Sequence, residues 1–97
     1  MMNTKKREFG LIIISIQAAV LRGSVTDKVT NEPLIGAVIQ ISGTTTGAIT
    51  DLDGNFELAG LRNGTYKLMV SYVSYKTLTL EVSVNGMSEI NITLAPD

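Results

Sequence analysis

The chain has 97 residues, enough for one domain with a modest hydrophobic core. Hydrophobic residues make up 44% of it and charged residues 18%, at a formal net charge of -1, which indicates a globular chain without a basic excess for nucleic acid. Cysteine and histidine are both absent, which excludes disulfides, thiolate catalysis and the commonest general base and metal ligands. We therefore expect no enzyme, no cofactor and no metal site.

The first twenty residues differ from the rest of the chain. A basic block at residues 5–7 precedes an apolar run at 9–16 and a patch containing small residues at 17–19. This order is typical of a secretory signal peptide. The apolar run is too short to span a bilayer, which takes about 20 apolar residues. The alternative is that the run forms a first buried strand or helix of the domain.

Two cleavage points are compatible with this signal peptide. Cleavage after Ala18 places Ile16 and Ala18 at the two positions that signal peptidase reads, whereas cleavage after Ala19 places the less suitable Gln17 there. We predict a signal peptide at residues 1–19 and a single domain at residues 20–97. The domain is then secreted across the inner membrane.

From Leu21 onward, apolar residues alternate with polar ones at a period of two, the pattern of half-buried strands. Asp51 to Asn55 has the composition of a tight turn and predicts a hairpin over residues 47–58. Asn85-Gly86 predicts a second hairpin, between the last two strands. About seven short strands with turns every 8–12 residues predict an all-β fold, a seven-stranded sandwich of two antiparallel sheets.

Five segments resemble one family. They are Leu21-x-Gly23-x-Val25-x-Asp27, Glu32-Pro33-Leu34-Ile35-Gly36-Ala37, Ile39-x-Ile41-x-Gly43-Thr44, Gly47-Ala48-Ile49-Thr50-Asp51-Leu52-Asp53-Gly54-Asn55-Phe56 and Val70-Ser71-Tyr72-Val73-Ser74-Tyr75. In this order and spacing they resemble the carboxypeptidase-regulatory-like domain. The resemblance extends from about Leu21 to Leu94 and implies a transthyretin-like (prealbumin-like) sandwich. Ser74 departs from the family, which usually has glycine there, and we interpret this as a mild change at a strand position.

In its commonest setting this family precedes the plug and barrel of SusC-type, TonB-dependent outer-membrane receptors, which import glycans or other nutrients. The resemblance therefore implies a noncatalytic periplasmic accessory domain, associated with the outer membrane through the receptor. Its expected partners are the receptor plug or the TonB machinery. The chain stops at Asp97, so we expect it to be truncated before plug and barrel. The alternative is a stand-alone secreted carbohydrate-binding or adhesin-like module.

Three tyrosines are candidates for stacking against a sugar ring. Tyr66 and Tyr72 share the parity of Leu68 and Val70, so we expect them at the core or its edge, with their hydroxyls at the rim. Tyr75 has the opposite parity and lies near a strand end. We therefore predict Tyr75 to be the exposed one and the candidate for ligand contact.

The carboxylates suggest two further sites, and in each case ordinary turn chemistry is the preferred interpretation. Asp51-x-Asp53-Gly54 resembles part of a calcium loop, but the twelfth position of an EF-hand loop would be Arg62 instead of a bidentate acid. Asp27, Glu32 and Asp51 could act as paired acids only if they converged, and nothing in their spacing predicts this. Each lies where a capped turn is expected.

Overall fold

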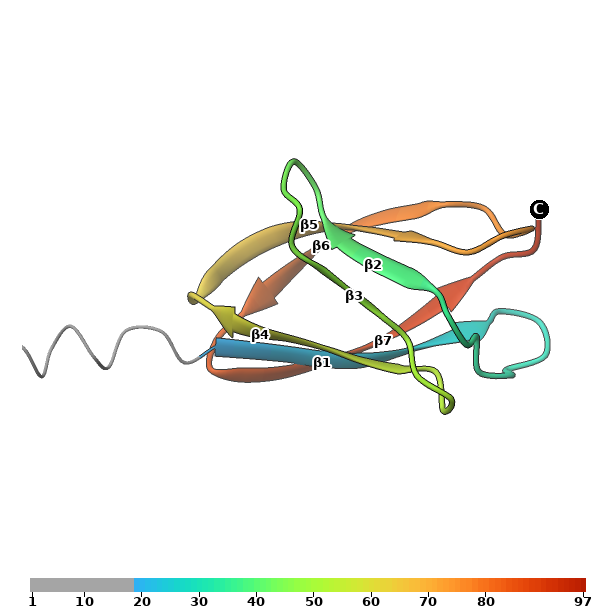
Figure 1. The fold of residues 1–97 in the computed structure, drawn as a ribbon, viewed down its shortest axis with the longest axis horizontal. Coiled ribbons are helices and arrows are strands. Elements are labelled where there is room, and N and C mark those ends of the chain that lie inside the picture. Colours follow the sequence, from blue (N-terminus) through green and yellow to red (C-terminus); the bar gives the residue numbers. More distant parts are fainter. Residues whose placement is uncertain (1–18) are drawn as a thin grey trace, which may run out of the picture.

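The computed structural model describes residues 19–97 (Figure 1). The predicted signal peptide therefore lies outside the described residues, apart from Ala19, with which the first strand begins. No helix in residues 19–97 is long and apolar enough to cross a membrane.

Seven strands make up the domain (Figure 1). They are β1 (Ala19–Asp27), β2 (Val38–Ile41), β3 (Gly47–Ile49), β4 (Asn55–Leu61), β5 (Gly64–Ser71), β6 (Leu78–Val84) and β7 (Met87–Leu94). They form a three-stranded sheet in the order β4-β1-β7 and a four-stranded sheet in the order β3-β2-β5-β6. The predicted fold class, an all-β sandwich of seven strands, is confirmed.

One strand pair differs from the antiparallel sheets that the sequence predicts. β1 and β7 pair in parallel, from Val20 opposite Met87 to Asp27 opposite Leu94. Every other strand pair in the described part of the chain is antiparallel. The first and last strands can run in the same direction because the whole of the intervening chain connects them, as a parallel pair requires.

Both predicted hairpins are wrong. β3 pairs with β2 while β4 pairs with β1, so the turn at Asp51–Asn55 carries the chain from one sheet to the other. The Asn85-Gly86 turn likewise joins β6 of the four-stranded sheet to β7 of the three-stranded sheet. Gly54 and Gly86 do have positive φ, at 78° and 65°. The turns are therefore as tight as expected, but a tight turn does not require that the next strand stay in the same sheet.

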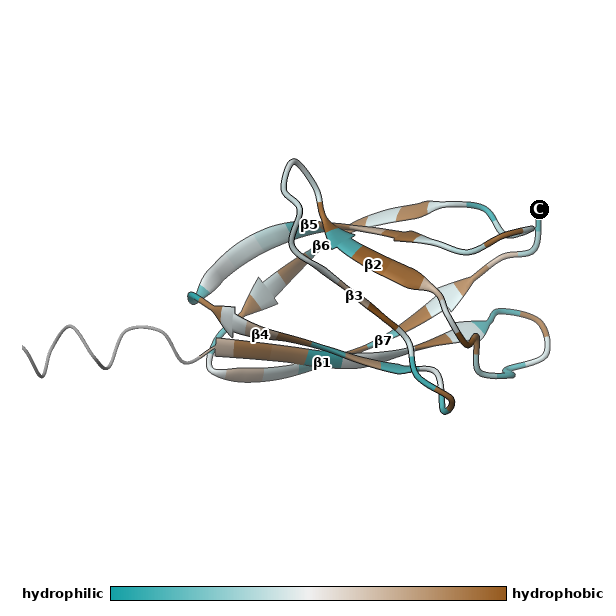
Figure 2. Ribbon diagram, in the orientation of Figure 1, coloured by the Kyte–Doolittle hydropathy of each residue, from teal (hydrophilic) through white to brown (hydrophobic). Residues whose placement is uncertain are grey.

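The core lies between the two sheets and is built from alternate residues of the strands. Tyr66, Leu68, Val70 and Tyr72 face it as predicted, with Leu68 and Val70 fully buried and the two tyrosines half-buried. Figure 2 shows this alternation as hydrophobic and polar bands along the ribbons. The buried core consists of Ala19, Leu21, Val25, Leu34, Ala37, Ile39, Ile41, Phe56, Leu58, Leu61, Leu68, Val70, Val82, Val84, Ile92 and Leu94.

Gly23 is one of the glycines that the packing requires. It lies opposite Phe56 on the neighbouring strand, and the Phe56 ring covers it. A Cβ at position 23 would clash with that ring, at 2.7 Å, and with the Ile90 carbonyl oxygen, which lies closer still. Glycine therefore allows an aromatic ring to lie directly on the β1 backbone.

The interpretation of Ser74 as a strand residue is wrong. β5 ends at Ser71, and residues 72–75 form a turn in which the Tyr75 N–H donates to the Tyr72 carbonyl oxygen at 3.0 Å. Ser74 has a φ of 71°, in the left-handed region that favours glycine. The family's usual glycine at this position therefore suits a turn, and serine occupies it here with backbone strain.

Candidate functional site

Tyr75, the predicted ligand-contact residue, is half-buried and its hydroxyl is already bound. The hydroxyl donates a 2.5 Å hydrogen bond to Oδ2 of Asp27, and the ring packs at 5.6 Å from the Tyr72 ring, tilted by 49°. Backbone contacts hold the residue as well, because Tyr75 forms a bridge with Pro96. The ring is thus less exposed than predicted, and its contact with a ligand stays a prediction.

Asp27 is the centre of this cluster. Its carboxylate accepts hydrogen bonds from the Tyr75 hydroxyl and, through Oδ1, from the N–H groups of Val29 at 2.6 Å and Thr30 at 2.9 Å. The hydrogen bond from Tyr75, followed by those from the backbone of Thr30 and Val29, lowers the pKa of Asp27 below its ordinary value. The same bond to Asp27 raises the pKa of Tyr75 above its ordinary value. The pair is therefore held as a carboxylate and a neutral phenol.

Each of the three carboxylates considered for acid–base chemistry accepts a hydrogen bond within its own loop, and Asp27 also accepts the one from Tyr75. Asp27 caps the turn after β1, and Oδ1 of Asp51 accepts hydrogen bonds from the N–H groups of Asp53 and Asn55, both at 2.9 Å. Glu32 accepts a long hydrogen bond of 3.5 Å from the Thr30 hydroxyl. Within residues 19–97, no three side chains of the metal-binding types gather closely enough to hold an ion.

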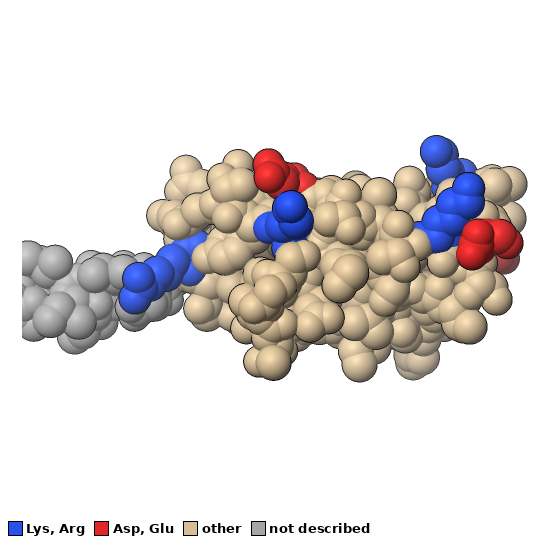
Figure 3. Space-filling view, turned by 90° about the horizontal axis from the view of Figure 1, so that it is seen from above, with Lys and Arg blue, Asp and Glu red and all other residues tan. Residues whose placement is uncertain are grey.

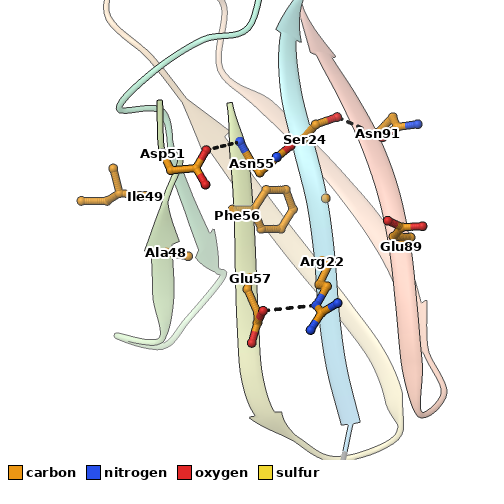
Figure 4. Close-up of a pocket in the computed structure, with 11 residues that line it drawn as sticks. Arg22, Ser24, Ala48, Ile49, Asp51, Asn55, Phe56, Glu57, Glu89 and Asn91 are labelled. Carbon is orange, nitrogen blue, oxygen red and sulfur yellow. Dashed lines mark hydrogen bonds and ion pairs between the residues drawn. The ribbon is translucent and has the colours of Figure 1, made fainter. Parts of the chain in front are cut away.

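A hollow of about 460 Å³ lies beside the three-stranded sheet (Figure 4). Two interactions cross its floor: Arg22 pairs with Glu57 at 3.2 Å, and the Ser24 hydroxyl donates to Oδ1 of Asn91 at 2.9 Å. Both groups of the ion pair are about half exposed, so water screens their attraction. Its lining is Arg22, Gly23, Ser24, Ala48, Ile49, Asp51, Asn55, Phe56, Glu57, Glu89 and Asn91.

This hollow was not anticipated from the sequence. Its lining comes from β1, β3, β4, β7 and the turn at Asp51, and the alternation of residues along single strands does not indicate that these elements enclose a hollow. Three carboxylates and one guanidinium line it, so its charge disfavours an anionic ligand. It contains no exposed aromatic ring on which a sugar could stack.

The four-stranded sheet presents a different surface. In the view from the side on which this sheet lies, charged side chains form small groups separated by wide uncharged areas (Figure 3). Two exposed apolar side chains, Val38 and Val73, lie together there. A shallow hollow of about 430 Å³ is lined by Gly36, Val38, Ser71, Tyr72 and Val73. The lining of this hollow contains no charged side chain, whereas charged and polar side chains predominate in the hollow beside the three-stranded sheet.

Comparison with known proteins confirms the family that the sequence resembles. Residues 21–97 match the family model of the CarboxypepD_reg-like domain. The chain is 38% identical over 81 residues to the TonB-dependent receptor SusC of Bacteroides thetaiotaomicron, and the match covers 84% of this chain. It spans 7% of the length of that receptor.

Two kinds of solved structure have a similar fold. A type II cohesin–X-dockerin complex from Acetivibrio cellulolyticus, carrying a C-terminal interface mutation, matches with a TM-score of 0.69 at 27% identity over 79% of this chain and 57% of that chain. A DUF3823 family protein from Bacteroides ovatus matches with a TM-score of 0.61 at 20% identity over 82% of this chain and 45% of that chain. The second likeness concerns the fold alone.

Proposed function

Because the chain belongs to the CarboxypepD_reg-like domain family, we propose that residues 20–97 are a noncatalytic accessory domain of a SusC-type, TonB-dependent nutrient uptake receptor. The observation that carries this proposal is the 38% identity to SusC over 84% of the chain. The geometry is compatible with a binding role, since the carboxylates of Asp27 and Asp51 are occupied in capping their own turns. What the domain offers to a partner is its sheet faces and strand edges.

In this proposal the domain works in the periplasm, next to the outer membrane, and binds another protein. The partner is the receptor plug or the TonB machinery, and the imported nutrient is a glycan. Protein contact is favoured over sugar contact because the exposed surface offers apolar side chains such as Val38 and Ile49, whereas the half-buried Tyr75 has its hydroxyl bound to Asp27. Aromatic faces, on which sugars stack, are less accessible here than aliphatic surface.

Export is part of the same proposal. We place signal-peptide cleavage after Ala18, one residue before the boundary predicted from the sequence, because Ala19 is 1% exposed and pairs with Leu61 as the first residue of β1. Cleavage after Ala19 would remove this pairing. The mass of the secreted protein distinguishes the two cleavage points, since a chain that begins at Ala19 supports the first and one that begins at Val20 supports the second.

Two gene arrangements are compatible with this proposal. In the first, the sequence after the codon of Asp97 encodes the plug and barrel, and this chain is a truncated product. In the second, a separate gene encodes them. Sequencing the gene and its transcript past that codon tests the first arrangement. A continuous reading frame with a plug and barrel supports it, whereas a stop codon followed by an unrelated gene contradicts it.

Binding to isolated partner domains is the direct test of the function. We expect the full chain to bind a SusC-type plug domain or the periplasmic fragment of TonB in isothermal titration calorimetry, and not to bind glycans. Glycan binding that Tyr75→Ala abolishes, without binding to either protein, would contradict the proposal and favour a carbohydrate-binding module. Tyr66→Ala is the matched control, because Tyr66 is also half-buried and lies elsewhere on the sandwich.

A further inference from the structure

The two sheets have four edge strands, β3, β4, β6 and β7. An edge strand presents N–H and C=O groups that no neighbouring strand satisfies, and an extended segment of another protein can pair with them. The four edges of this domain are not equally open. Their differences indicate where a partner strand can be added.

β3 and β4 are poor acceptors of a further strand. β3 has three residues. At the start of β4, Asp51 occupies the free backbone groups of Asn55: its side chain accepts the Asn55 N–H, and its own N–H donates to the Asn55 carbonyl, both at 2.9 Å. Near the end of β4 the pairing with β1 shifts register opposite Ala19–Leu21, where Gly60 has a φ of 72°. A capped turn and a bulge both protect an edge from pairing.

β6 is regular over its whole length. Its register with β5 is unbroken from Val84 opposite Gly64 to Leu78 opposite Val70. On the other side of β5, the Ser42 N–H donates to the Lys67 carbonyl oxygen at 2.9 Å, so the backbone groups of Lys67 face β2.

The direction of the backbone groups of β6 follows from this register. Because these groups alternate along a strand, those of Tyr66, Leu68 and Val70 face β6 and bond to their partners there. Consequently, Thr79, Glu81 and Ser83 direct their N–H and C=O groups away from β5, toward the open edge.

Two of the inward side chains of β6 are only partly covered. Leu78 and Leu80 are half-buried, whereas their partners on β5, Val70 and Leu68, are fully buried. β7 is an equally regular edge, and each of the two strands has two buried inward residues, Val82 and Val84 on β6 and Ile92 and Leu94 on β7. The difference is that β7 has one half-buried inward apolar residue, Ile90, where β6 has two leucines. A strand added to β6 would therefore bury more apolar surface than a strand added to β7.

The charge of these edges indicates the chemistry of the partner. β6 and β7 each carry one charged residue, Glu81 and Glu89, and neither strand contains a lysine or arginine. A second copy of the chain would bring acidic edges together, and like charges opposite each other destabilise a strand pair. A lysine or arginine opposite Glu81 stabilises it.

We propose that the open edge of β6 is a strand-addition site for an extended, basic segment of a protein partner. Main-chain hydrogen bonds to Thr79, Glu81 and Ser83 hold the added strand, and its inward apolar side chains cover Leu78 and Leu80. This inference rests on the proposed protein-binding function and specifies the surface that performs it.

Amide hydrogen exchange of the full chain with a synthetic peptide tests the site. The probe is a capped peptide of alternating valine and threonine with two lysines, and the control is the same peptide with glutamates in place of the lysines. We expect the lysine peptide to slow exchange at Thr79, Glu81 and Ser83, and the glutamate peptide to leave it unchanged. Unchanged exchange with both peptides, or slowing at Glu89 and Asn91 instead, overturns the inference. So does slowing that depends on protein concentration without peptide, because it indicates a second copy.

Charge reversal at the two exposed acidic side chains tests the assignment. Because Glu81 lies opposite Lys67 on β5, the thermal unfolding of Glu81→Lys is measured first to show that the fold is kept. Glu81→Lys should weaken binding of the lysine peptide roughly fivefold or more, while the matched control Glu89→Lys leaves it unchanged. Equal weakening by both variants overturns the assignment to β6.

The same pair of variants separates this inference from the proposed function. If the wild-type chain and Glu81→Lys bind the plug domain or TonB fragment equally, the β6 site is wrong and the function stands. If the wild-type chain binds neither protein but binds the lysine peptide at β6, the function is wrong and the edge site stands.

Discussion

The hydroxyl of Tyr75 and the carboxylate of Asp27 lie 2.5 Å apart although 48 positions separate them in the sequence. The bond joins the end of β1 to the turn that follows β5, and Tyr75 also forms a bridge with Pro96 next to it. Three parts of the chain therefore meet at one end of the sandwich, around Tyr75.

The first prediction concerns the pH dependence of stability. The pKa of Asp27 is below its ordinary value of 3.8 in the folded chain, so its stabilising contribution is present above about pH 4 and is lost as the pH falls through the folded-state pKa. The pKa of Tyr75 is above its ordinary value of 10.0, so its contribution is present below about pH 10 and is lost as the pH rises through its folded-state pKa. Tyr75→Phe should lower the melting temperature at pH 7 by a few degrees. It should also make the melting temperature fall less steeply toward acidic and toward alkaline pH.

Thermal unfolding followed by circular dichroism between pH 3 and pH 11 measures this profile. Tyr66→Phe is the control, because the Tyr66 hydroxyl donates to a backbone oxygen, the Arg62 carbonyl at 2.7 Å, instead of a carboxylate. A Tyr75→Phe profile parallel to that of the wild type would contradict the coupling.

The second prediction concerns Thr50, a buried hydroxyl that holds the segment between β1 and β2. It accepts a hydrogen bond from the Ala37 N–H at 2.8 Å and donates one to the Leu34 carbonyl oxygen at 2.6 Å. Thr50→Val leaves both backbone groups without a partner, at about 1–3 kcal/mol for each buried group. Urea unfolding should show this loss, whereas the exposed Thr45→Val should change stability by less than about 0.5 kcal/mol. An equal loss of stability in the two variants would mean that the Thr50 hydroxyl is not needed to satisfy the backbone hydrogen bonds of this segment.

The third prediction is a stabilising substitution. Because Ser74 has a φ of 71°, replacing it with glycine removes a left-handed strain of about 1 kcal/mol, less the entropy that glycine loses on folding. We expect Ser74→Gly to raise the free energy of unfolding by roughly 0.5 kcal/mol. Ser83→Gly, in the regular strand β6, should lower it by about 0.5–1 kcal/mol. A loss of stability in Ser74→Gly as large as in Ser83→Gly would show that the turn is not strained.

The fourth prediction measures the core. Leu68 is 0% exposed, and Leu68→Ala should cost about 2–5 kcal/mol, a large part of the 5–15 kcal/mol that stabilises a typical domain. Leu52→Ala is the matched control, because Leu52 is 79% exposed in the turn before β4 and its loss should cost less than about 0.5 kcal/mol. Chemical denaturation measures both variants. Equal denaturant midpoints for the two would contradict the inward orientation of Leu68 on β5.

The inward and outward faces of the strands could be predicted because side-chain alternation is a local property. The parity that placed Leu68 and Val70 inward is correct, and so is the expectation that the Tyr66 hydroxyl reaches the rim, where it contacts the backbone of Arg62. The turn at Asp51–Asn55 was predicted for the same reason, since Asp51 caps groups only two and four residues away.

Which strands pair could not be predicted in the same way. Asn85-Gly86 reverses the chain tightly, but β7 joins the other sheet because it pairs with β1, and no local signal encodes a contact between the two ends of the domain. The burial of Tyr75 has a similar cause, since its partner Asp27 lies far away in the sequence. The hollow beside the three-stranded sheet and the open edge of β6 also depend on strand order, so neither could be identified beforehand.

The parallel pairing of β1 with β7 determines how the domain responds to mechanical tension. β1 begins beside Met87, and β7 ends beside Asp27, so the two strands leave their shared ladder at opposite ends (Figure 1). A force that pulls on both ends of the sandwich shears the two strands past each other, and all the hydrogen bonds between them carry this force at once. Hydrogen bonds that share a shearing force must break together, whereas the hydrogen bonds of a hairpin that is pulled open break one after another. The parallel pairing therefore makes the domain more resistant to tension along its length than a terminal hairpin would.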